Sequence, residues 1–269
     1  MFRAAVLIAI ALLSAGGCAK EPPMASIRAG CVSCHEAHHV EAGACESCHR
    51  GDPNAAREAI AHQRLLAGRA AAHRLAGSAA VREGERLIGQ LACRRCHVID
   101  REGNRLATSL DRAVWEREQR ELELSIRRPV EGMPRFALSE LQTGSVIASL
   151  LRHAEREGAD PGYQVRFENR GNADSPFARH CGGCHRALLL DGPAGRGSGG
   201  PNLSGLFTLH YPACAEKNRP WDEALLGDWL ENPRAIRPAT TMRPVKLDPG
   251  ERLELVMELR GSGPAPNRK

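Results

Sequence analysis

The feature that most constrains this chain of 269 residues is a five-residue motif, Cys-x-x-Cys-His, which occurs four times. The copies are Cys31-Val-Ser-Cys34-His35, Cys45-Glu-Ser-Cys48-His49, Cys93-Arg-Arg-Cys96-His97 and Cys181-Gly-Gly-Cys184-His185. Two thiols at this spacing can form thioethers to the two vinyl groups of one porphyrin, and the adjoining His can reach the iron as its proximal ligand. Because this motif is the attachment signature of c-type haem, the sequence predicts four covalently bound haem c groups.

Two other chemistries also use paired cysteines. Structural zinc sites contain Cys-x-x-Cys pairs, but they do not require a His directly after the second Cys, and here all four motifs have one. A thioredoxin-like redox pair is expected once, in a βαβ context, rather than four times in helical surroundings. Zinc and thiol redox chemistry therefore remain the alternatives to haem.

The N-terminus has the pattern of an export signal. Arg3 precedes an apolar run over residues 4–13, which is too short to span a bilayer, and small residues follow up to Cys18. We predict a signal peptide over residues 1–17. The small residues before Cys18 resemble a bacterial lipoprotein box, although Ala15 stands where Leu is usual. This resemblance implies that Cys18 is lipidated, and Ala19 resembles the outer-membrane sorting case. We expect an exported protein, periplasmic or at the cell surface.

The remaining cysteine and the composition give two further expectations. Eight of the ten cysteines belong to the motifs and Cys18 to the anchor, which leaves Cys214 as a buried or free thiol, a haem ligand or half of an intermolecular disulfide. Only 4% of the residues are aromatic, so haem would supply much of the apolar surface that the core needs. Eight haem propionates would offset the formal charge of +5, so we do not predict nucleic-acid binding.

After the signal the chain divides into three parts. Residues 18–77 contain the anchor and two crowded motifs, residues 78–157 contain the third motif, and residues 158–269 contain the fourth. In residues 79–91 and 141–151, apolar side chains recur at helical spacing, which predicts a helix in each. We expect an all-α protein.

The middle and last parts resemble the class I cytochrome c family. In the middle part the resemblance rests on the two expected helices and on Gly132-Met133-Pro134, and it implies that Met133 is the second axial ligand. The family's Gly-Pro-x-Leu loop has no clear counterpart there. In the last part the loop is present as Gly199-Gly-Pro201-Asn-Leu203, followed by Thr241-Met242-Arg-Pro244 and an expected helix over residues 251–259. Met257 lies on that helix, and we expect it to be a core residue rather than a ligand. The resemblance implies that the Pro201 carbonyl holds the ring of His185, that Met242 is the axial ligand, and that each part is a small helical domain.

The first part follows a different pattern, because it offers no usable Met ligand. His38, His39, His62 and His73 lie near its two motifs, so both irons are expected to be bis-His ligated. His38 and His39 follow His35 too closely to cross over its haem, so one of them is expected to cap the second haem. We assign His39 to that role and His62 to the first haem, with His38 and His73 as rivals. The pattern Cys48-His-Arg-Gly-Asp-Pro53, followed by Ala61-His62, resembles the compact, loop-rich di-haem modules of multihaem cytochromes.

Bis-His irons generally have lower potentials than His/Met irons, so electrons would move from the first pair of haems towards the last two. We expect an electron-transfer protein that works with other redox proteins, such as cytochromes or a quinol-oxidising complex, and that meets the membrane through its lipid anchor. The alternative is a haem enzyme, similar to di-haem peroxidases or acting as an oxyanion reductase, in which one distal ligand is displaceable.

Overall fold

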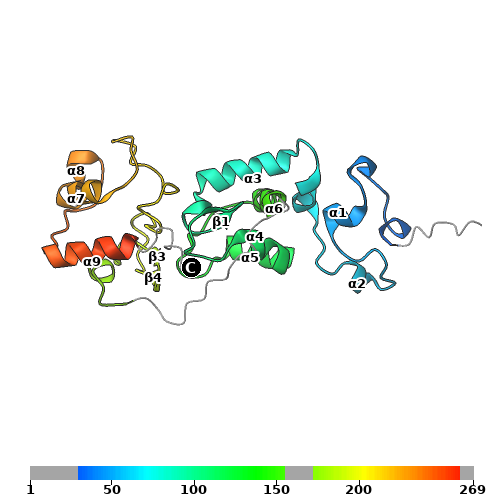
Figure 1. Ribbon diagram of the computed structural model, residues 1–269, viewed down its shortest axis with the longest axis horizontal. Coiled ribbons are helices and arrows are strands. Elements are labelled where there is room, and N and C mark those ends of the chain that lie inside the picture. Colours follow the sequence, from blue (N-terminus) through cyan, green and yellow to red (C-terminus); the bar gives the residue numbers. More distant parts are fainter. Residues whose placement is uncertain (1–29, 155–171, 261–269) are drawn as a thin grey trace, which may run out of the picture.

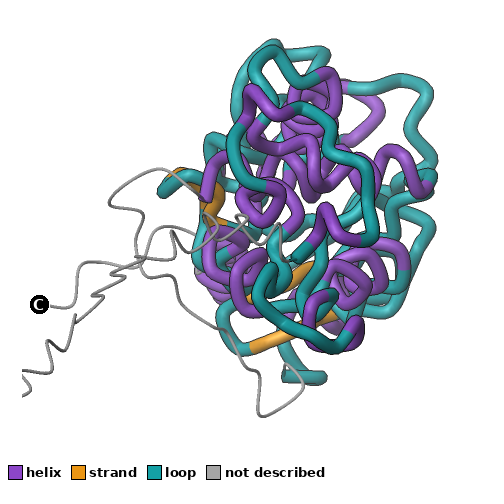
Figure 2. Tube along the Cα trace, turned by 90° about the vertical axis from the view of Figure 1, so that its right-hand side faces the viewer, coloured by secondary structure: helices purple, strands orange, loops and turns teal. Residues whose placement is uncertain are grey.

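The computed structural model describes residues 30–154 and 172–260. Figure 1 shows three parts in succession along the long axis of the molecule: the blue first part, the cyan and green middle part, and the yellow to red last part. Helices dominate the described ranges, and strands form only two short antiparallel hairpins there, which Figure 2 shows in orange. The predicted all-α class is therefore confirmed as a helix-rich fold, to which the hairpins are a small addition.

The first part consists of short turns and helices joined by loops. They are η1 (Cys31–Ser33), η2 (Val40–Ala42), α1 (Cys45–His49), α2 (Glu58–Ala61) and η3 (Gly68–Arg74). No side chain between residues 30 and 65 is buried. The first buried residue is Leu66, and η3 then packs against helix α6 (Glu140–Ala154) of the middle part. Among its described residues, 30–77, the first part thus has no apolar core of its own, and η3 packs against the middle part.

The middle part is built around α6 and α3 (Ala79–Gln90), which cross at close range. A Cβ atom at Gly84 would lie 2.0 Å from the carbonyl oxygen of Ser145, so only glycine permits this crossing. The two helices correspond to those predicted over residues 79–91 and 141–151. Around them lie β1 (Val98–Ile99), β2 (Glu102–Gly103), α4 (Leu110–Glu116) and α5 (Gln119–Arg127).

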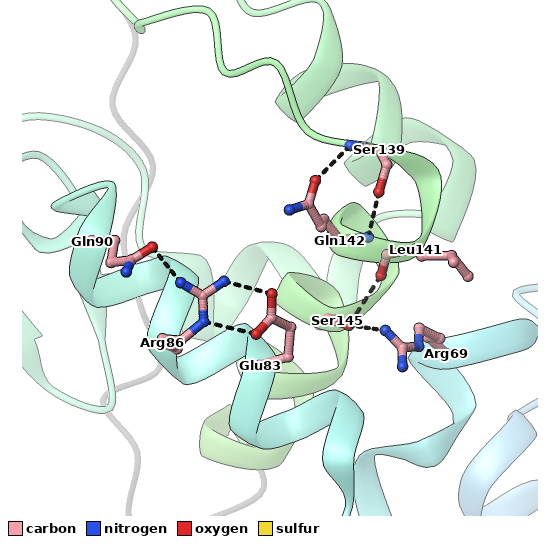
Figure 3. Close-up of polar contacts among 8 residues, drawn as sticks. All are labelled: Arg69, Glu83, Arg86, Gln90, Ser139, Leu141, Gln142 and Ser145. Carbon is pink, nitrogen blue, oxygen red and sulfur yellow. Dashed lines mark hydrogen bonds and ion pairs between the residues drawn. The ribbon is translucent and has the colours of Figure 1, made fainter.

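Polar contacts fix the start of α6 and its connection to the first part (Figure 3). Ser139 and Gln142 cap the helix reciprocally: the Ser139 amide donates to Gln142 Oε1 at 3.0 Å, and the Gln142 amide donates to Ser139 Oγ at 3.2 Å. One turn later, Ser145 Oγ accepts a hydrogen bond from Arg69 of η3 at 3.2 Å. Capping satisfies amides that the first turn of a helix leaves unpaired.

The last part contains a π-helical turn, two strands and three helices. They are η5 (Phe177–Cys181), β3 (Ala187–Leu189), β4 (Gly192–Ala194), α7 (Glu223–Glu231), α8 (Pro233–Ile236) and α9 (Pro249–Arg260). Phe177 is fully buried at the centre, against Leu226 and Leu255. We expected Met257 of α9 to be a core residue, and this was wrong, because its side chain is 55% exposed.

The middle and last parts pack against each other. Cys96 and Leu106 from the middle part form a buried apolar cluster with Leu188 of β3. Within the described ranges, no helix combines the length and the apolar character that crossing a membrane requires.

Candidate functional site

Each Cys-x-x-Cys-His motif folds into a single turn of backbone. In the first, third and fourth motifs, the His amide donates to the carbonyl of the first Cys: His35 to Cys31 at 2.8 Å, His97 to Cys93 at 3.1 Å and His185 to Cys181 at 2.8 Å. The second motif is the helix α1 itself. This closure brings two thiols and one imidazole into the same turn four times over.

No disulfide joins the eight motif cysteines, all of which lie in the described ranges, and two of them, Cys96 and Cys181, are buried. Burial raises the pKa of Cys93 and of Cys181 to about 11, and it also raises the pKa of Cys96. A thiol with a raised pKa stays neutral and is a poor nucleophile in exchange reactions. The environment of these thiols is therefore unlike that of a thioredoxin-type redox pair.

Three of the motif histidines are anchored through Nδ1 to a backbone carbonyl. His49 contacts the carbonyl oxygen of Leu66 at 2.8 Å, His97 that of Thr108 at 2.7 Å, and His185 that of Pro201 at 2.8 Å. Because a carbonyl can only accept, Nδ1 must carry the proton, and in the neutral ring Nε2 then keeps its lone pair. This is the tautomer in which a histidine binds a metal through Nε2.

The Pro201 contact is the one that the family resemblance implied. The contacts to the carbonyls of Thr108 and Leu66 could not be predicted from the sequence, because no side-chain type marks the position of a backbone acceptor. Burial lowers the pKa of His97, against the opposing effect of its bond to Thr108, and so favours the neutral ring.

The first part brings its histidines together in two pairs. The ring centroids of His35 and His62 lie 5.9 Å apart, and those of His38 and His49 lie 5.6 Å apart. Two metal–imidazole bonds of about 2 Å, each extended by about 1 Å to the ring centre, separate opposed ligands by roughly 6 Å. Both pairs have the spacing of two imidazoles on opposite sides of one iron.

In this arrangement the ring beside His35 is that of His62, which we assigned to the first haem, and the ring beside His49 is that of the rival His38. The ring of His39 contacts His38 and the carboxylate of Glu41, at 3.4 Å from its Nδ1, so His38 is the residue beside His49. His39 has a left-handed backbone with φ of 49°, which turns the chain at this point. The rival His73 is buried, with its Nδ1 3.2 Å from the carbonyl oxygen of Ala70.

Met133, the predicted axial ligand of the middle part, is half-buried beside a cavity of about 360 Å³. The cavity lies between the middle and last parts. Its cationic lining comes from both sides: Arg135 from the loop that carries Met133, and Arg186 and Arg196 from the last part. Arg186 follows His185 directly and donates to the carbonyl of Arg196 at 2.9 Å.

Met242, the predicted axial ligand of the last part, lies among aromatic side chains. The indole Nε1 of Trp229 donates to the Met242 sulfur at 3.0 Å, and Trp221 packs against the same cluster. Cys214 is only 1% exposed in this cluster, and its thiol donates to Glu216 at 3.6 Å. The buried-thiol interpretation of Cys214 is therefore the one that its surroundings favour.

A structural zinc site takes four Cys or His ligands, and within residues 30–154 and 172–260 no three His, Cys, Asp or Glu side chains converge as a metal cluster. The predicted signal peptide and Cys18 lie outside the described residues.

No protein-family model matches this chain, and no solved structure matches it. Its function is therefore inferred from the site itself.

Proposed function

We propose that this protein is a tetrahaem c-type cytochrome that transfers electrons outside the cytoplasm. In this proposal a compact bis-His di-haem module precedes two domains of the class I cytochrome c type, and Cys18 anchors the chain to the membrane through lipid. Its partners would be other redox proteins, either cytochromes or a quinol-oxidising complex.

The observation that carries the proposal is the carbonyl anchoring of the motif histidines. His49, His97 and His185 each hold a proton at Nδ1 and present Nε2 as the acceptor atom, beside two thiols in the same turn. These residues fit haem c, because the thiols can bond to its vinyl groups while Nε2 binds its iron. Haem bound in this way supplies a one-electron iron couple whose potential the axial ligands adjust.

The packing of the first part supports the same conclusion. Between residues 30 and 65 the side chains are exposed or half-buried, including Val40 at 74% and Ile60 at 45% exposure. A segment of this length that buries so little apolar surface cannot offset its own loss of conformational entropy. Two porphyrins between the histidine pairs would provide the missing apolar contacts.

The predicted ligands differ in a way that suits a relay. The first two centres would have two imidazoles each, whereas Met133 and Met242 would give the last two a thioether ligand and a higher potential. The distal ligands would leave no vacant position at any iron. This favours electron transfer over catalysis, with electrons passing from the first part to the last.

A second candidate function has one observation in its favour. Met133 borders a cavity whose lining includes three arginines and one carboxylate, that of Glu131, and the excess of positive charge suits a small anion. Displacement of Met133 from the iron would then open a substrate position, as in an oxyanion reductase or a di-haem peroxidase. Ligand binding distinguishes this enzyme from the relay.

The proposal is tested by counting haems and titrating them in the purified holoprotein. Intact mass and the pyridine haemochrome spectrum should give four haems, and a Cys→Ala double variant of each motif should remove one. An optical and EPR redox titration should then resolve a lower-potential pair and a higher-potential pair, all low-spin and inert to carbon monoxide, nitrite and peroxide. Metal analysis that finds zinc in place of haem would refute the proposal, and one haem that turns over nitrite or peroxide would establish the enzyme instead.

A further inference from the structure

The loop that anchors His185 also contacts the middle part. Asn202 follows Pro201 directly, and its side-chain Nδ2 donates to the carbonyl oxygen of Gly132 at 3.1 Å. Gly132 is bonded to Met133, the predicted axial ligand of the third haem. Asn202 therefore links the loop that holds His185 to the loop that carries Met133 by one side-chain hydrogen bond.

Every polar group of the Asn202 side chain has a defined partner. Its Oδ1 accepts from the Ser204 amide at 3.0 Å and from Ser204 Oγ at 2.6 Å. Because the Ser204 amide can only donate, Oδ1 must face it, and Nδ2 must then face Gly132. The orientation of the amide is thus fixed by chemistry, and rotation would break contacts on both sides.

The backbone of Asn202 joins the third motif to the same point. Its carbonyl oxygen accepts from Arg95 Nη1 at 3.1 Å and from the Tyr211 hydroxyl at 3.2 Å. Arg95 lies inside the third Cys-x-x-Cys-His motif, and its guanidinium also covers the Tyr211 ring at 5.6 Å from the centroid. The third motif is therefore in direct contact with the loop that anchors His185.

Two glycines show that this junction is closely packed. Gly132 has φ of +93°, and a Cβ atom there would lie 3.2 Å from Leu188. Gly205 has φ of +69°, and a Cβ atom there would lie 2.5 Å from the Arg95 carbonyl oxygen. Both positions require glycine for the backbone conformation, and at Gly205 the opposing part also leaves no room for a side chain.

We propose that Asn202 is a positioning residue that holds the third and fourth haem centres at a fixed separation and in bonded contact. This inference rests on the proposed function. Electron tunnelling weakens steeply with distance, and it crosses bonds and hydrogen bonds more readily than empty gaps. The path from His185 Nδ1 through Pro201 and Asn202 to Gly132 and Met133 has only two hydrogen bonds, of 2.8 and 3.1 Å. One electron passing along it oxidises one centre and reduces the other, with no further reactant.

The sharpest test is Asn202→Asp in the full-length holoprotein. Aspartate keeps the acceptor that Ser204 needs but replaces the donor facing Gly132 with a second acceptor. The control is Asn232→Asp, which adds the same charge in the same domain but at the start of α8, where Asn and Asp cap equally well. Electron exchange between the two centres would be measured after photoreduction, and their separation by pulsed EPR of the oxidised protein.

We expect Asn202→Asp to slow the exchange by about tenfold and to broaden the distance distribution. The lost hydrogen bond and the new repulsion lower the population of the bonded contact by about that factor, and fast exchange requires that contact. The haem count and the low-spin spectra should not change, and Asn232→Asp should behave as the wild type. Tyr211→Phe, which removes one hydroxyl contact, should give a smaller effect and serves if Asn202→Asp does not accumulate. Unchanged exchange and distance in a variant with four low-spin haems would overturn the inference alone, whereas missing haems in the wild type would overturn the proposed function.

Discussion

His38 and His39 are adjacent residues for which the proposed architecture predicts opposite roles. If His38 caps the second haem, replacing it should leave that iron with His49 alone. We consider His38→Asn and His39→Asn, because asparagine tolerates the left-handed backbone found at His39 and is a poor ligand for haem iron. The two variants remove the same group from neighbouring positions, so each is the control for the other.

The magnitude follows from the geometry of the first part. The His38 and His49 rings are 5.6 Å apart, close to the separation of roughly 6 Å that two ligands on one metal require. The His39 side chain is 53% exposed and contacts Glu41. His38→Asn should therefore convert one haem of the four from low-spin to high-spin and let that haem bind carbon monoxide, whereas His39→Asn should convert none.

The assay is EPR of the oxidised protein together with a carbon monoxide titration of the reduced protein. His38→Met gives a further check, since a thioether in place of the imidazole should restore a six-coordinate iron but raise its potential. A high-spin haem in His39→Asn, with His38→Asn unchanged, would refute this assignment and support His39 as the ligand. Four low-spin haems in both variants would place the ligand of the second iron elsewhere.

Three further results are expected. Gly84→Ala should destabilise the protein by about 2–3 kcal/mol in thermal or urea unfolding, because the new methyl group meets the Ser145 carbonyl, whereas Gly89→Ala has open space and should gain up to about 1 kcal/mol. The Arg237 hydrogen bond lowers the pKa of Glu216 from 4.5 to about 2. The contribution of this pair to the free energy of unfolding should therefore be complete above pH 4.5 and lost as the pH falls through 2. Arg237→Gln should remove this part of the pH dependence in urea unfolding. The protein expressed without haem attachment should lose amide-exchange protection throughout the first part. Protection that persists there would contradict the packing argument.

The Cys-x-x-Cys-His motifs can be recognised in the sequence because the haem attachment that they predict is local chemistry. The thioethers and the proximal bond require two Cys and one His in a fixed five-residue spacing, whatever the surrounding fold. Helices α3 and α6 could be predicted because their apolar residues recur at helical spacing. Both kinds of signal are contained in short stretches of chain.

The features that sequence reasoning missed depend on turns and on tertiary contacts. His38 and His39 differ by one position, the backbone of His39 is left-handed, and it is the ring of His38 that lies beside His49. Met257 is two residues from Leu255, about 200° around α9, so the helix buries Leu255 and exposes Met257. Asn202 lay within a recognised loop motif, but its contact with Gly132 joins residues far apart in sequence and leaves no local signal.

The three anchored histidines reach the same contact by different routes. Their carbonyl partners lie 17 residues after His49, 11 after His97 and 16 after His185, in a loop before η3, a loop before α4 and a Gly-Pro-Asn-Leu loop. The partner residues Leu66, Thr108 and Pro201 have no side-chain chemistry in common. What is constant is the contact between Nδ1 and a carbonyl oxygen, which places a proton on Nδ1 and, in a neutral ring, leaves the lone pair on Nε2, as a metal-bound imidazole requires. A purely structural histidine has no such requirement, because either of its nitrogens can satisfy a buried acceptor. The repetition of one tautomer across three unrelated loops therefore argues for ligation more strongly than any one of these contacts does alone.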